Sequence, residues 1–531
     1  MRFHPSHKFA IGLLEWLLVA LVLMLFASQL PPEVNEPNYL AKARHYWDSS
    51  WCESDFFLST ADAHAPFYLG FGWLFLFLPM EVAAWIGRIF TCGVLALGWV
   101  RLTRAVAPQP GMAVISAVTM LGLSSFFQLS GEWIVGGFEG KGLAYGFIFL
   151  ALADLAKNRW NRAWILLGIA SIWHVVVGGW ACVAATIGWF LLGSRSDRPT
   201  LRSQIGAIVL GFFISLLGLL PGMQLGGEAT REQLRQAASI QVFARLPHHL
   251  DPQHFLISTS FPYLTPAAIR FLLLVCLWAL LATRLKANVA AHRFNLFTAG
   301  TLAIAMIGLL ISFTTRADPL LSARLLQFYW FRLADVMVPA ACGLSLVCYL
   351  TATDALRHRV LRTGVLLGTL IILCIPLSAH HQAAGIPPAD RKFTRYPASY
   401  QDWLAACHQA RRLTPPDALF LTPKYNHTFK WHAGRGEVAT WKEMPQDAPS
   451  VLEWNDRLAR LYPNGPYGAV PLAARSATAI RNLGNRYGAG YVLTRASPHL
   501  ALPLLYRNES FALYRIAPSP PAEQRDAPSL P

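Results

Sequence analysis

The chain has 531 residues, of which 54% are apolar and only 14% are charged, and its net charge is +16. Because soluble domains carry about 25% charged residues, this composition excludes an entirely soluble protein and predicts a polytopic α-helical membrane protein with one soluble appendage. The Lys and Arg residues form short clusters between apolar segments, which indicates cytoplasmic loops and argues against a nucleic-acid partner. The clusters are Arg2 and Lys8; Arg101 and Arg104; Lys157, Arg159 and Arg162; Arg195, Arg198 and Arg202; Arg284, Lys286 and Arg293; and Arg357, Arg359 and Arg362.

The apolar segments predict about eleven transmembrane helices, with the N-terminus inside and the C-terminus outside the cytoplasm, because every basic cluster then lies on the cytoplasmic side. Several segments are shorter than the ~20 residues of a straight crossing, and the two around Gly178 and Gly179 fit one buried hairpin as well as two spans. The expected spans are 9–30, 82–100, 111–129, 140–156, 163–177, 180–192, 205–220, 268–282, 296–313, 333–350 and 365–377. The resulting membrane domain is 1–379, with outer loops 31–81, 130–140, 222–266 and 314–332.

The first outer loop places several carboxylates where the first apolar segment ends, at the boundary between membrane and water. They include Glu33, Glu36, Asp55 and Asp62. Such groups are costly at this depth unless they bind or react with something, so we interpret the loop as the active-site loop. The apolar residues 69–78 are too few to cross the membrane and predict an interfacial or re-entrant element.

The second outer loop carries Glu132, Glu139 and Lys141 in a glycine-rich turn. Glycines let a backbone approach a ligand closely, so the loop fits a substrate-binding site, although a solvated turn between helices explains it too. We predict that Glu36, Asp55, Glu132 and Glu139 converge on one face of the membrane. Crowded carboxylates tend to share a metal or a proton.

The third outer loop contains an expected amphipathic helix over residues 228–245 and then Arg245, His248, His249, Asp251 and His254. Imidazole and carboxylate groups suit zinc or manganese, so the three histidines are candidate metal ligands. Their spacing matches no specific metal motif. Histidines that bind the backbone of a surface loop, or that face a phosphate, are equally compatible with it.

The fourth outer loop carries Arg324 and Arg332 around a run of aromatic residues. The planar fork of arginine can make two hydrogen bonds to one phosphate, and aromatic residues favour the headgroup level. Arginines that merely anchor a helix at the interface fit the same pattern, and both interpretations remain open. We expect His174 to be a packed histidine.

After residue 379 the composition changes to that of a small α/β domain, 380–516, outside the cytoplasm. Alternating or buried apolar runs predict strands, helical periodicity predicts two helices, and a Pro-rich tail, 517–531, is expected to be disordered. The predicted strands are 417–423, 490–494 and 511–516, and the predicted helices are 399–413 and 449–461. Two cysteines on the outer side, Cys52 and Cys407, either pair or remain unrelated thiols.

The first loop resembles the GT-C superfamily of polytopic glycosyltransferases, which includes protein mannosyltransferases, aminoarabinose transferases and oligosaccharyltransferases. The resemblance lies in Glu36-x-x-Tyr39, Asp55-Phe-Phe and His64-Ala-Pro-Phe-Tyr68, followed by an interfacial element, a second acidic loop and an outer α/β domain. It implies that a first-loop carboxylate is the base or a metal ligand, and this role maps onto Glu36 with Asp55 as the second candidate. The chain departs from the family by having Asn before Glu36, where Asp-Glu or a lone Asp is common.

Residues 429–442 also look like uncharacterised bacterial membrane proteins of this architecture, which implies a location in the bacterial inner membrane with the C-terminal domain periplasmic or extracellular. The implied reaction transfers a sugar, with inversion, from a polyprenyl-phosphate donor to an unknown acceptor. The expected substrate-binding residues are Tyr39, His64, Glu132, Glu139, Lys141, Arg245, Arg324 and Arg332. A divalent metal, Mg or Mn, would be held by members of the set Glu36, Asp55, His248, His249 and His254.

Two other classes of protein fit the composition. A transporter or flippase for a lipid-linked or small anionic substrate also has many helices and charges at membrane level, but it usually shows internal repeats and acids at the midplane. The acids of this chain cluster near one face instead. A non-catalytic membrane scaffold is the third class.

Overall fold

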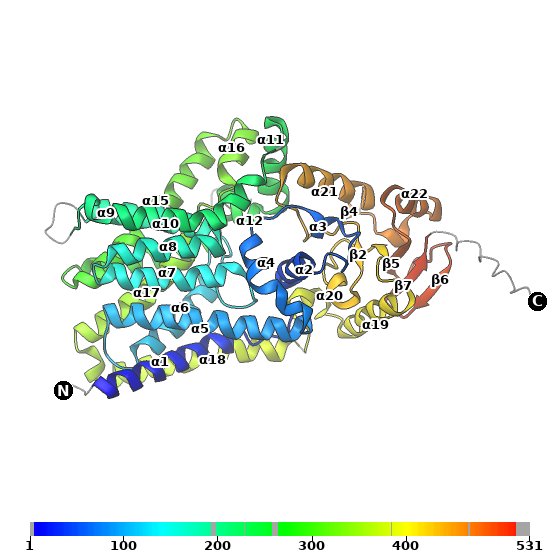
Figure 1. Cartoon of the computed structure of the whole chain (residues 1–531). Helices are drawn as coiled ribbons and strands as arrows, with labels where there is room; N and C mark the ends of the chain where they lie inside the picture. Colours follow the sequence, from blue (N-terminus) through cyan, green and yellow to red (C-terminus); the bar gives the residue numbers. More distant parts are fainter. Residues whose placement is uncertain are drawn as a thin grey trace, which may run out of the picture.

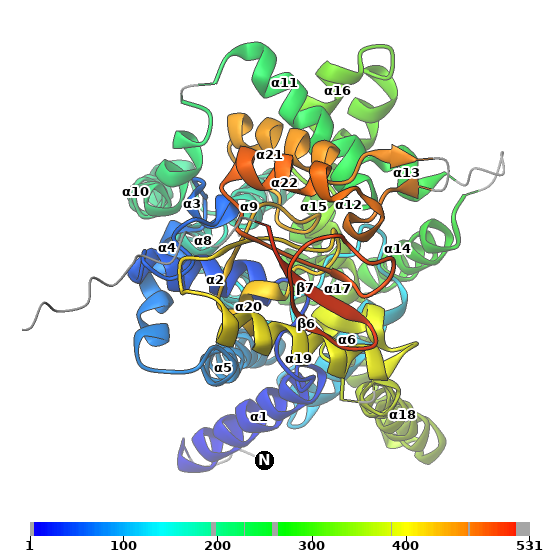
Figure 2. The same ribbon diagram turned by 90° about the vertical axis from the view of Figure 1, so that its right-hand side faces the viewer.

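The computed structural model describes residues 5–192, 198–227, 229–257, 264–383, 385–465 and 468–516. A bundle of long helices carries a small α/β domain at one end, and we call this end of the bundle the domain end (Figure 1). Figure 2 looks onto the domain end, with β6, β7 and α19 in front of the bundle. The expected disordered tail, 517–531, lies outside the described residues.

Each predicted span corresponds to a helix of the bundle. Among the described residues, seven helices are long and apolar enough to cross a membrane by themselves, so the chain is a multi-pass membrane protein. They are α1 (Pro5–Phe26), α5 (Met80–Val106), α10 (Leu201–Gln224), α14 (Pro266–Arg284), α15 (Val289–Thr314), α17 (Arg332–Ala352) and α18 (Arg359–Ala383). The other four are shorter: α6 (Met112–Phe126), α7 (Gly140–Ala156), α8 (Trp160–Trp173) and α9 (Val175–Leu191).

The short helix α7 lies in the middle of the bundle, and all but one of its residues are buried. Its glycines explain the close packing against α5: a Cβ added at Gly98 would lie 2.5 Å from the carbonyl oxygen of Gly146. In the same way, a Cβ added at Gly168 of α8 would lie 2.3 Å from the carbonyl oxygen of Gly211 of α10. Small residues therefore set the helix spacing, as is common between membrane helices.

The break between α8 and α9 lies at His174 and not at Gly178 and Gly179, where the sequence led us to place it. His174 has an extended backbone, with φ −155° and ψ 100°, and its Nδ1 accepts a hydrogen bond from the N–H of Val177. Gly178 instead provides a packing contact, since an added Cβ would lie 2.4 Å from Ser171 Oγ. The two helices therefore form a tight hairpin.

Short helices fill the domain end between the bundle and the α/β domain. The expected interfacial element forms α4 and a 3-10 helix, which are together too short to cross a membrane. The expected amphipathic helix becomes α11 followed by a π-helical segment, and residue 228 lies outside the described residues. The elements are α2 (Glu36–Trp47), α3 (Phe56–Ser59), α4 (Ala65–Phe71), a 3-10 helix (Gly72–Leu76), α11 (Arg231–Ser239), the π-helical segment (Ile240–Arg245), α12 (Pro247–Leu250), α13 (Pro252–Leu256) and α16 (Pro319–Leu326).

The C-terminal domain contains a five-stranded sheet of order β2-β1-β5-β7-β6, in which β1 pairs in parallel with β2 and β5 while β7 is antiparallel to β5 and β6. The three strands and two helices expected from the sequence form as β1, β5, β7, α19 and α21, and the sequence did not indicate the remaining elements. The bounds are α19 (Pro397–Leu413), β1 (Leu419–Leu421), α20 (Phe429–Ala433), β2 (Gly436–Glu437), α21 (Ala448–Leu461), β3 (Asn464–Gly465), β4 (Gly468–Ala469), α22 (Ala477–Tyr487), β5 (Tyr491–Arg495), β6 (Leu504–Arg507) and β7 (Phe511–Arg515).

Alternating residues of the strands pack on opposite sides of this sheet. Phe420 and Leu513 contact the apolar cluster that contains Trp403 of α19. Leu421 and Ala512 belong to the cluster on the other face, which contains residues of α21 and α22. The period of two is what a sheet covered on both faces requires.

Cys52 and Cys407 are both free thiols, and each is buried in a different apolar cluster. The two side chains are therefore unrelated small apolar packers, and the alternative in which they pair does not form.

Candidate functional site

A fully enclosed polar contact of the domain end is the ion pair between Glu36, the first residue of α2, and Arg88 of α5. Arg88 donates from Nε to Oε1 at 2.7 Å and from NH2 to Oε2 at 2.6 Å. The backbone N–H of Phe138 donates to Oε1 and that of Glu33 to Oε2, both at 2.8 Å. Arg88 also donates to the carbonyl oxygen of Ala27 at 3.1 Å, so the pair joins the first loop, the second loop and the end of α1.

This geometry changes the role that the sequence assigned to Glu36. The side chain is 0% exposed and four donors share its two oxygens. A general base must reach the proton of its substrate, and Glu36 has no free face from which to do so. Glu36 is thus a structural anchor in this conformation, and its expected role as base or metal ligand stays a prediction.

Two acids near Glu36, namely Glu33 and Glu139, accept fewer hydrogen bonds than Glu36 does. Glu139, the residue before α7, accepts a hydrogen bond from Asn35 Nδ2 at 3.2 Å and faces Lys141 Nζ at 3.5 Å. Burial, followed by the charges of Glu139 and Glu36, raises the pKa of Glu33 to about 8. We call Glu33, Glu36 and Glu139 the carboxylate cluster.

Glu33 was not predicted individually as a site residue from the sequence, although the glycine pair of the second loop is a signal that points to it. Gly136 has φ +154°, and a Cβ added at Gly137 would lie 3.0 Å from both Glu33 Cβ and Glu36 Cγ. Only a chain without side chains can pass so close to these acids.

A second cluster surrounds Arg332 at the start of α17. Arg332 Nε lies 3.0 Å from Glu132 Oε2, and its NH1 lies 3.3 Å from His174 Nε2. The guanidinium also lies over the ring of Tyr329, 3.6 Å from its centroid. The structure therefore brings together Arg332 and Glu132, two of the expected substrate-binding residues, and it adds His174, for which a packing role had been expected.

Two substrate-binding candidates of the first loop complete this cluster. The rings of His64 and His174 have centroids 5.3 Å apart, and Tyr39 Oη lies 3.1 Å from His64 Nε2. Burial lowers the pKa of His64, so its imidazole is neutral at neutral pH. We call Arg332, Glu132, His174, His64 and Tyr39 the arginine cluster.

The two clusters adjoin each other at the start of α7. A Cβ added at Gly140, between Glu139 and Lys141, would lie 2.4 Å from the carbonyl oxygen of Trp173, which directly precedes His174. Tyr39 is also only one helical turn from Glu36 on α2. The domain end therefore has one continuous polar region, with acids on one side and Arg332 on the other.

Cations from other segments border this region. Arg245, at the end of the π-helical segment, donates from Nε to the carbonyl oxygen of Trp441 at 2.9 Å. The carbonyl oxygen of Lys442, the residue after Trp441, accepts a hydrogen bond from Asn38 Nδ2 at 3.2 Å. Burial and the charge of Arg245 lower the pKa of Lys442 to about 8. The C-terminal domain thus contributes a lysine that sequence analysis had not selected.

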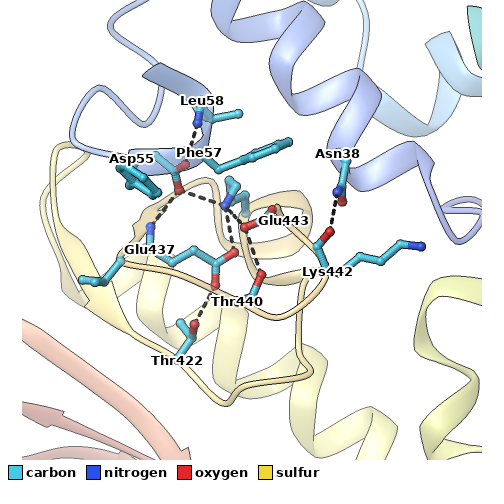
Figure 3. A network of polar contacts seen from close by, with 12 residues as sticks. Asn38, Asp55, Phe57, Leu58, Thr422, Glu437, Thr440, Lys442 and Glu443 are labelled. Atoms are coloured by element: carbon cyan, nitrogen blue, oxygen red, sulfur yellow. Dashed lines mark hydrogen bonds and ion pairs between the residues drawn. The ribbon is translucent and has the colours of Figure 1, made fainter. Parts of the chain in front are cut away.

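Asp55 lies in a different contact, shown in Figure 3. Its Oδ1 accepts from the N–H of Leu58 at 3.0 Å, and its Oδ2 accepts from the N–H of Glu437 at 2.9 Å and lies 2.8 Å from Lys430 Nζ. Asp55 thus lies at the domain end as the other loop acids do, but its contacts among the described residues are with Leu58, Glu437 and Lys430. Asp55 instead attaches the first loop to the C-terminal domain.

The other partners of Lys430 are also acidic. Its Nζ lies 2.9 Å from Glu437 and 2.6 Å from Glu443, and all these side chains are buried (Figure 3). The three carboxylates raise the pKa of Lys430, while burial raises the pKa of Glu443. We call Asp55, Lys430, Glu437 and Glu443 the interface cluster.

The histidines of the third loop, which are expected metal ligands, lie near one another at the domain end. His249 Nδ1 binds the carbonyl oxygen of Ser130, and burial lowers the pKa of His249 to about 3. His248 and His254 line a cavity of about 510 Å³ together with Arg270. Among the described residues, no three His, Cys, Asp or Glu side chains are grouped as a metal site requires. Of the expected ligands, the three histidines lie near one another, with the ring centroids of His248 and His249 4.1 Å apart, whereas Glu36 and Asp55 lie in two other contacts.

Arg324, the other arginine of the fourth loop, lies on α16, which packs against α11. In the part of the chain that the structure describes, Arg332 and not Arg324 contacts Glu132 and His174. Arg332 is therefore the better candidate for binding a phosphate.

Comparison with known families places a family model, a domain of unknown function (DUF6798), on residues 401–461. This stretch runs from α19 to α21 and includes Lys430, Glu437, Lys442 and Glu443, which contact the first loop or border the polar region. No curated protein matches the chain. The site is thus defined by its geometry alone.

Proposed function

We propose that this protein is a membrane glycosyltransferase of the GT-C type, which transfers a sugar from a polyprenyl-phosphate donor to an acceptor hydroxyl. The observation that carries the proposal is Arg332, whose side chain is only 15% exposed and is held by Glu132 and His174 directly beside a cluster of acids. A phosphate site next to a candidate base is the arrangement that this transfer requires.

The proposed orientation follows from the distribution of charge. Lys157, Arg159 and Arg162 lie around the connection of α7 and α8, at the end of the bundle away from the C-terminal domain (Figure 1). Because Lys and Arg are enriched in cytoplasmic loops, we place that end in the cytoplasm. The domain end then lies outside, at the periplasmic face of a bacterial inner membrane.

Arg332 is the proposed phosphate ligand. A guanidinium has five N–H donors, and Glu132 and His174 engage only two of its nitrogens. The remaining donors can bind phosphate oxygens, while Glu132 and Tyr329 fix the plane of the fork. Lys141 and Lys442 supply further positive charge around the same region.

Glu33 is the proposed base, in place of Glu36. Its pKa of about 8 lies near an ordinary working pH, which is the condition under which a base transfers protons most effectively. In the proposed step, Glu33 takes the proton of the acceptor hydroxyl while the oxygen of that hydroxyl bonds to the anomeric carbon of the sugar. The bond between that carbon and the phosphate oxygen breaks, the lipid phosphate leaves with the electron pair, and the configuration inverts.

The described residues do not form a set of three metal ligands, so no step of this mechanism is assigned to Mg or Mn. Charge stabilisation of the leaving phosphate is assigned to Arg332 and Lys141.

The test uses the purified full-length protein in lipid vesicles with a panel of radiolabelled polyprenyl-phosphate sugars. Release of polyprenyl phosphate, dependent on the protein and lost in Arg332→Ala, would support the proposal. Arg324→Ala is the matched control, because it removes an arginine from the same loop but outside the arginine cluster. If the wild-type protein released no lipid phosphate from any donor, the proposal would fail.

A further inference from the structure

A small cavity lies at the end of the bundle opposite the C-terminal domain, where α5, α7 and α8 come together. Its volume is about 240 Å³, just below the ~300–1,000 Å³ range of sites for whole small molecules, so its size suits a single small group. Figure 1 shows the connection of α7 and α8 at this end. The charged residues that line it are Arg101 of α5, Asp154 of α7, Lys157 and Arg159 between α7 and α8, and Arg162 of α8. We call it the cationic cavity.

Helix packing sets the position of Arg101 in this cavity. A Cβ added at Gly98 of α5 would lie 2.8 Å from Phe149 Cβ and 3.3 Å from the backbone nitrogen of Leu150, so α5 and α7 are in close contact here. Arg101 follows Gly98 by about one helical turn and therefore lies on the same side of α5. Leu150 lines the cavity too. Arg101 is thus placed by two packed helices and not by a loop.

The cavity holds more positive than negative charge. Asp154, which is 7% exposed, lies 3.3 Å from Arg162 Nε and 3.9 Å from Arg159 NH1. In the part of the chain that the structure describes, Arg101 and Lys157 have no ion pair, so four cations and one acid leave a net charge of +3. Burial, followed by the charge of Arg159, lowers the pKa of Lys157, and Asp154 offsets this only in part. An anion in the cavity would therefore be attracted.

The two helix ends at the cavity also favour an anion. The last four carbonyl oxygens of α7, 153–156, each accept a hydrogen bond, so the negative end of this helix is already satisfied. Arg159, which precedes α8, makes no capping hydrogen bond, and the first turn of α8 contains no acid. The first N–H groups of α8 are therefore open to an anion, which the partial positive charge of a helix N-terminus attracts.

The inner end of the cavity is apolar. Leu150 and Ala153 of α7, which are both buried, line it together with the charged residues. Leu150 precedes Lys157 by seven residues, or about 10 Å of helix, so the cavity runs from a cationic rim toward the interior of the bundle. A free phosphate ion has no apolar part to occupy the inner end. A phospholipid joins its phosphate to glycerol and acyl chains, and it therefore matches both ends of the cavity.

We propose that the cationic cavity binds the phosphate of an anionic phospholipid in the leaflet at this end of the bundle. Basic pockets between membrane helices are sites for anionic headgroups, and each Lys or Arg near the surface strengthens the attraction. Arg101, Lys157 and Arg162 bind the phosphate oxygens, while Asp154 orients Arg162. The site lies at the opposite end of the bundle from the carboxylate and arginine clusters, so it is independent of the proposed sugar transfer.

The first test uses the wild-type protein and so does not depend on the folding of a variant. The full-length protein in a non-ionic detergent is treated with formaldehyde and borohydride, which methylate accessible lysines, and the products are quantified by mass spectrometry. Lys286, an exposed lysine between α14 and α15, lies at the same end of the bundle but does not line the cavity. Dioleoyl phosphatidylglycerol should slow the methylation of Lys157 about five-fold and leave that of Lys286 unchanged.

Two arginines offer a matched pair of variants, Arg101→Gln and Arg284→Gln. Each variant removes one arginine from the same end of the bundle, but Arg284, in the last turn of α14, lies outside the cavity. We expect the lipid to protect Lys157 in Arg284→Gln and not in Arg101→Gln. Equal thermal unfolding of the two lipid-free variants shows that both are folded. Because the lipid binds the folded state, it should raise the Tm of the wild type more than that of Arg101→Gln.

Four results would each overturn the inference. Equal protection of Lys157 and Lys286 would show that an anionic lipid only coats this end of the protein. Equal protection by dioleoyl phosphatidylcholine would show that the cavity does not recognise the negative charge. Equal protection by sodium phosphate at the same concentration would assign the cavity to a soluble phosphate and not to a lipid. Protection of Lys157 that persists in a folded Arg101→Gln protein would show that the cavity is not the binding site.

Discussion

Arg88 and Glu36 form a bidentate ion pair, with contacts of 2.7 and 2.6 Å, in which both side chains are almost completely buried. The two residues lie on α5 and α2 and are 52 positions apart in the chain. Because Glu36 also accepts two backbone N–H groups, this pair fixes the start of the first loop relative to the second. The residue that the sequence pointed to as the base is therefore part of the scaffold of the site.

Removal of this charge should destabilise the protein. Glu36→Gln leaves Arg88 buried without its counter-charge, and breaking a buried ion pair costs about 3–5 kcal/mol. Thermal unfolding in detergent should show a clear loss, whereas Glu53→Gln, on an exposed side chain, should not. A Glu36→Gln protein of unchanged stability that has lost transfer would restore Glu36 as the base.

Glu33→Gln should behave in the opposite way. It removes the proposed base but keeps the shape of the side chain, so transfer should fall by ~10²–10⁴-fold while the protein stays folded. The rate is measured with radiolabelled donor at equal protein abundance. Substantial activity in this variant would exclude Glu33 and leave Glu139 as the remaining acid of the cluster.

The pH dependence of the same residue gives a second measurement. A base must be deprotonated, so kcat/KM should rise with pH until about 8, the raised pKa of Glu33. The stability of the fold should change with pH in the direction opposite to kcat/KM. Between the unfolded pKa of 4.5 and the folded value of about 8, the folded state binds the extra proton, so the free energy of unfolding decreases as pH rises. Both slopes should disappear in Glu33→Gln.

Arg332 should act through donor binding. Loss of a charge-assisted hydrogen bond costs about 1.5–3 kcal/mol, which corresponds to a donor KM roughly 10–150 times higher in Arg332→Lys, where the charge stays but the fork is lost. Arg324→Lys should leave KM unchanged, because Arg324 lies on α16. Equal effects of the two substitutions on the donor KM would show that Arg332 has no specific role in binding the donor phosphate.

The interface cluster predicts coupling between the first loop and the C-terminal domain. Lys430→Met leaves three carboxylates without their cation and should destabilise the protein by about 3–5 kcal/mol, whereas Arg460→Met, which breaks an exposed ion pair with Asp456, should leave its stability almost unchanged. Limited proteolysis of the first loop is the readout. Unchanged cleavage in Lys430→Met would show that the domain does not hold the loop.

The orientation can be tested without any substrate. An alkaline phosphatase reporter inserted beside the exposed Arg391 should be active, because this enzyme folds only outside the cytoplasm and the proposed orientation places the C-terminal domain there. Activity of a cytoplasmic reporter at the same position would reverse the orientation and remove the basis for a periplasmic site.

The helices and the central strands could be predicted from the sequence because the signals for them are local. Long apolar runs located α1, α5, α10, α14, α15, α17 and α18, and the buried run 417–423 located β1. The break at His174 could not be predicted in this way. Two adjacent glycines such as Gly178 and Gly179 are typical of a helix break. Gly178 nevertheless remains inside α9, because it packs closely against Ser171 of α8.

The sequence by itself determined that the polar loops carry acids, histidines and arginines at one end of an apolar bundle. Only the tertiary structure decided which of these residues neutralise each other, since their partners lie far away in the chain. Glu36 meets Arg88 and Asp55 meets Lys430, which removes both acids from the set that a substrate can reach. Arg332 meets Glu132 and His174, and Glu33 stays without a cation of its own among the described ion pairs. The energy and the protonation state of a charge in a low-dielectric region depend on its nearest neighbours. Those neighbours are set by the three-dimensional packing of the chain.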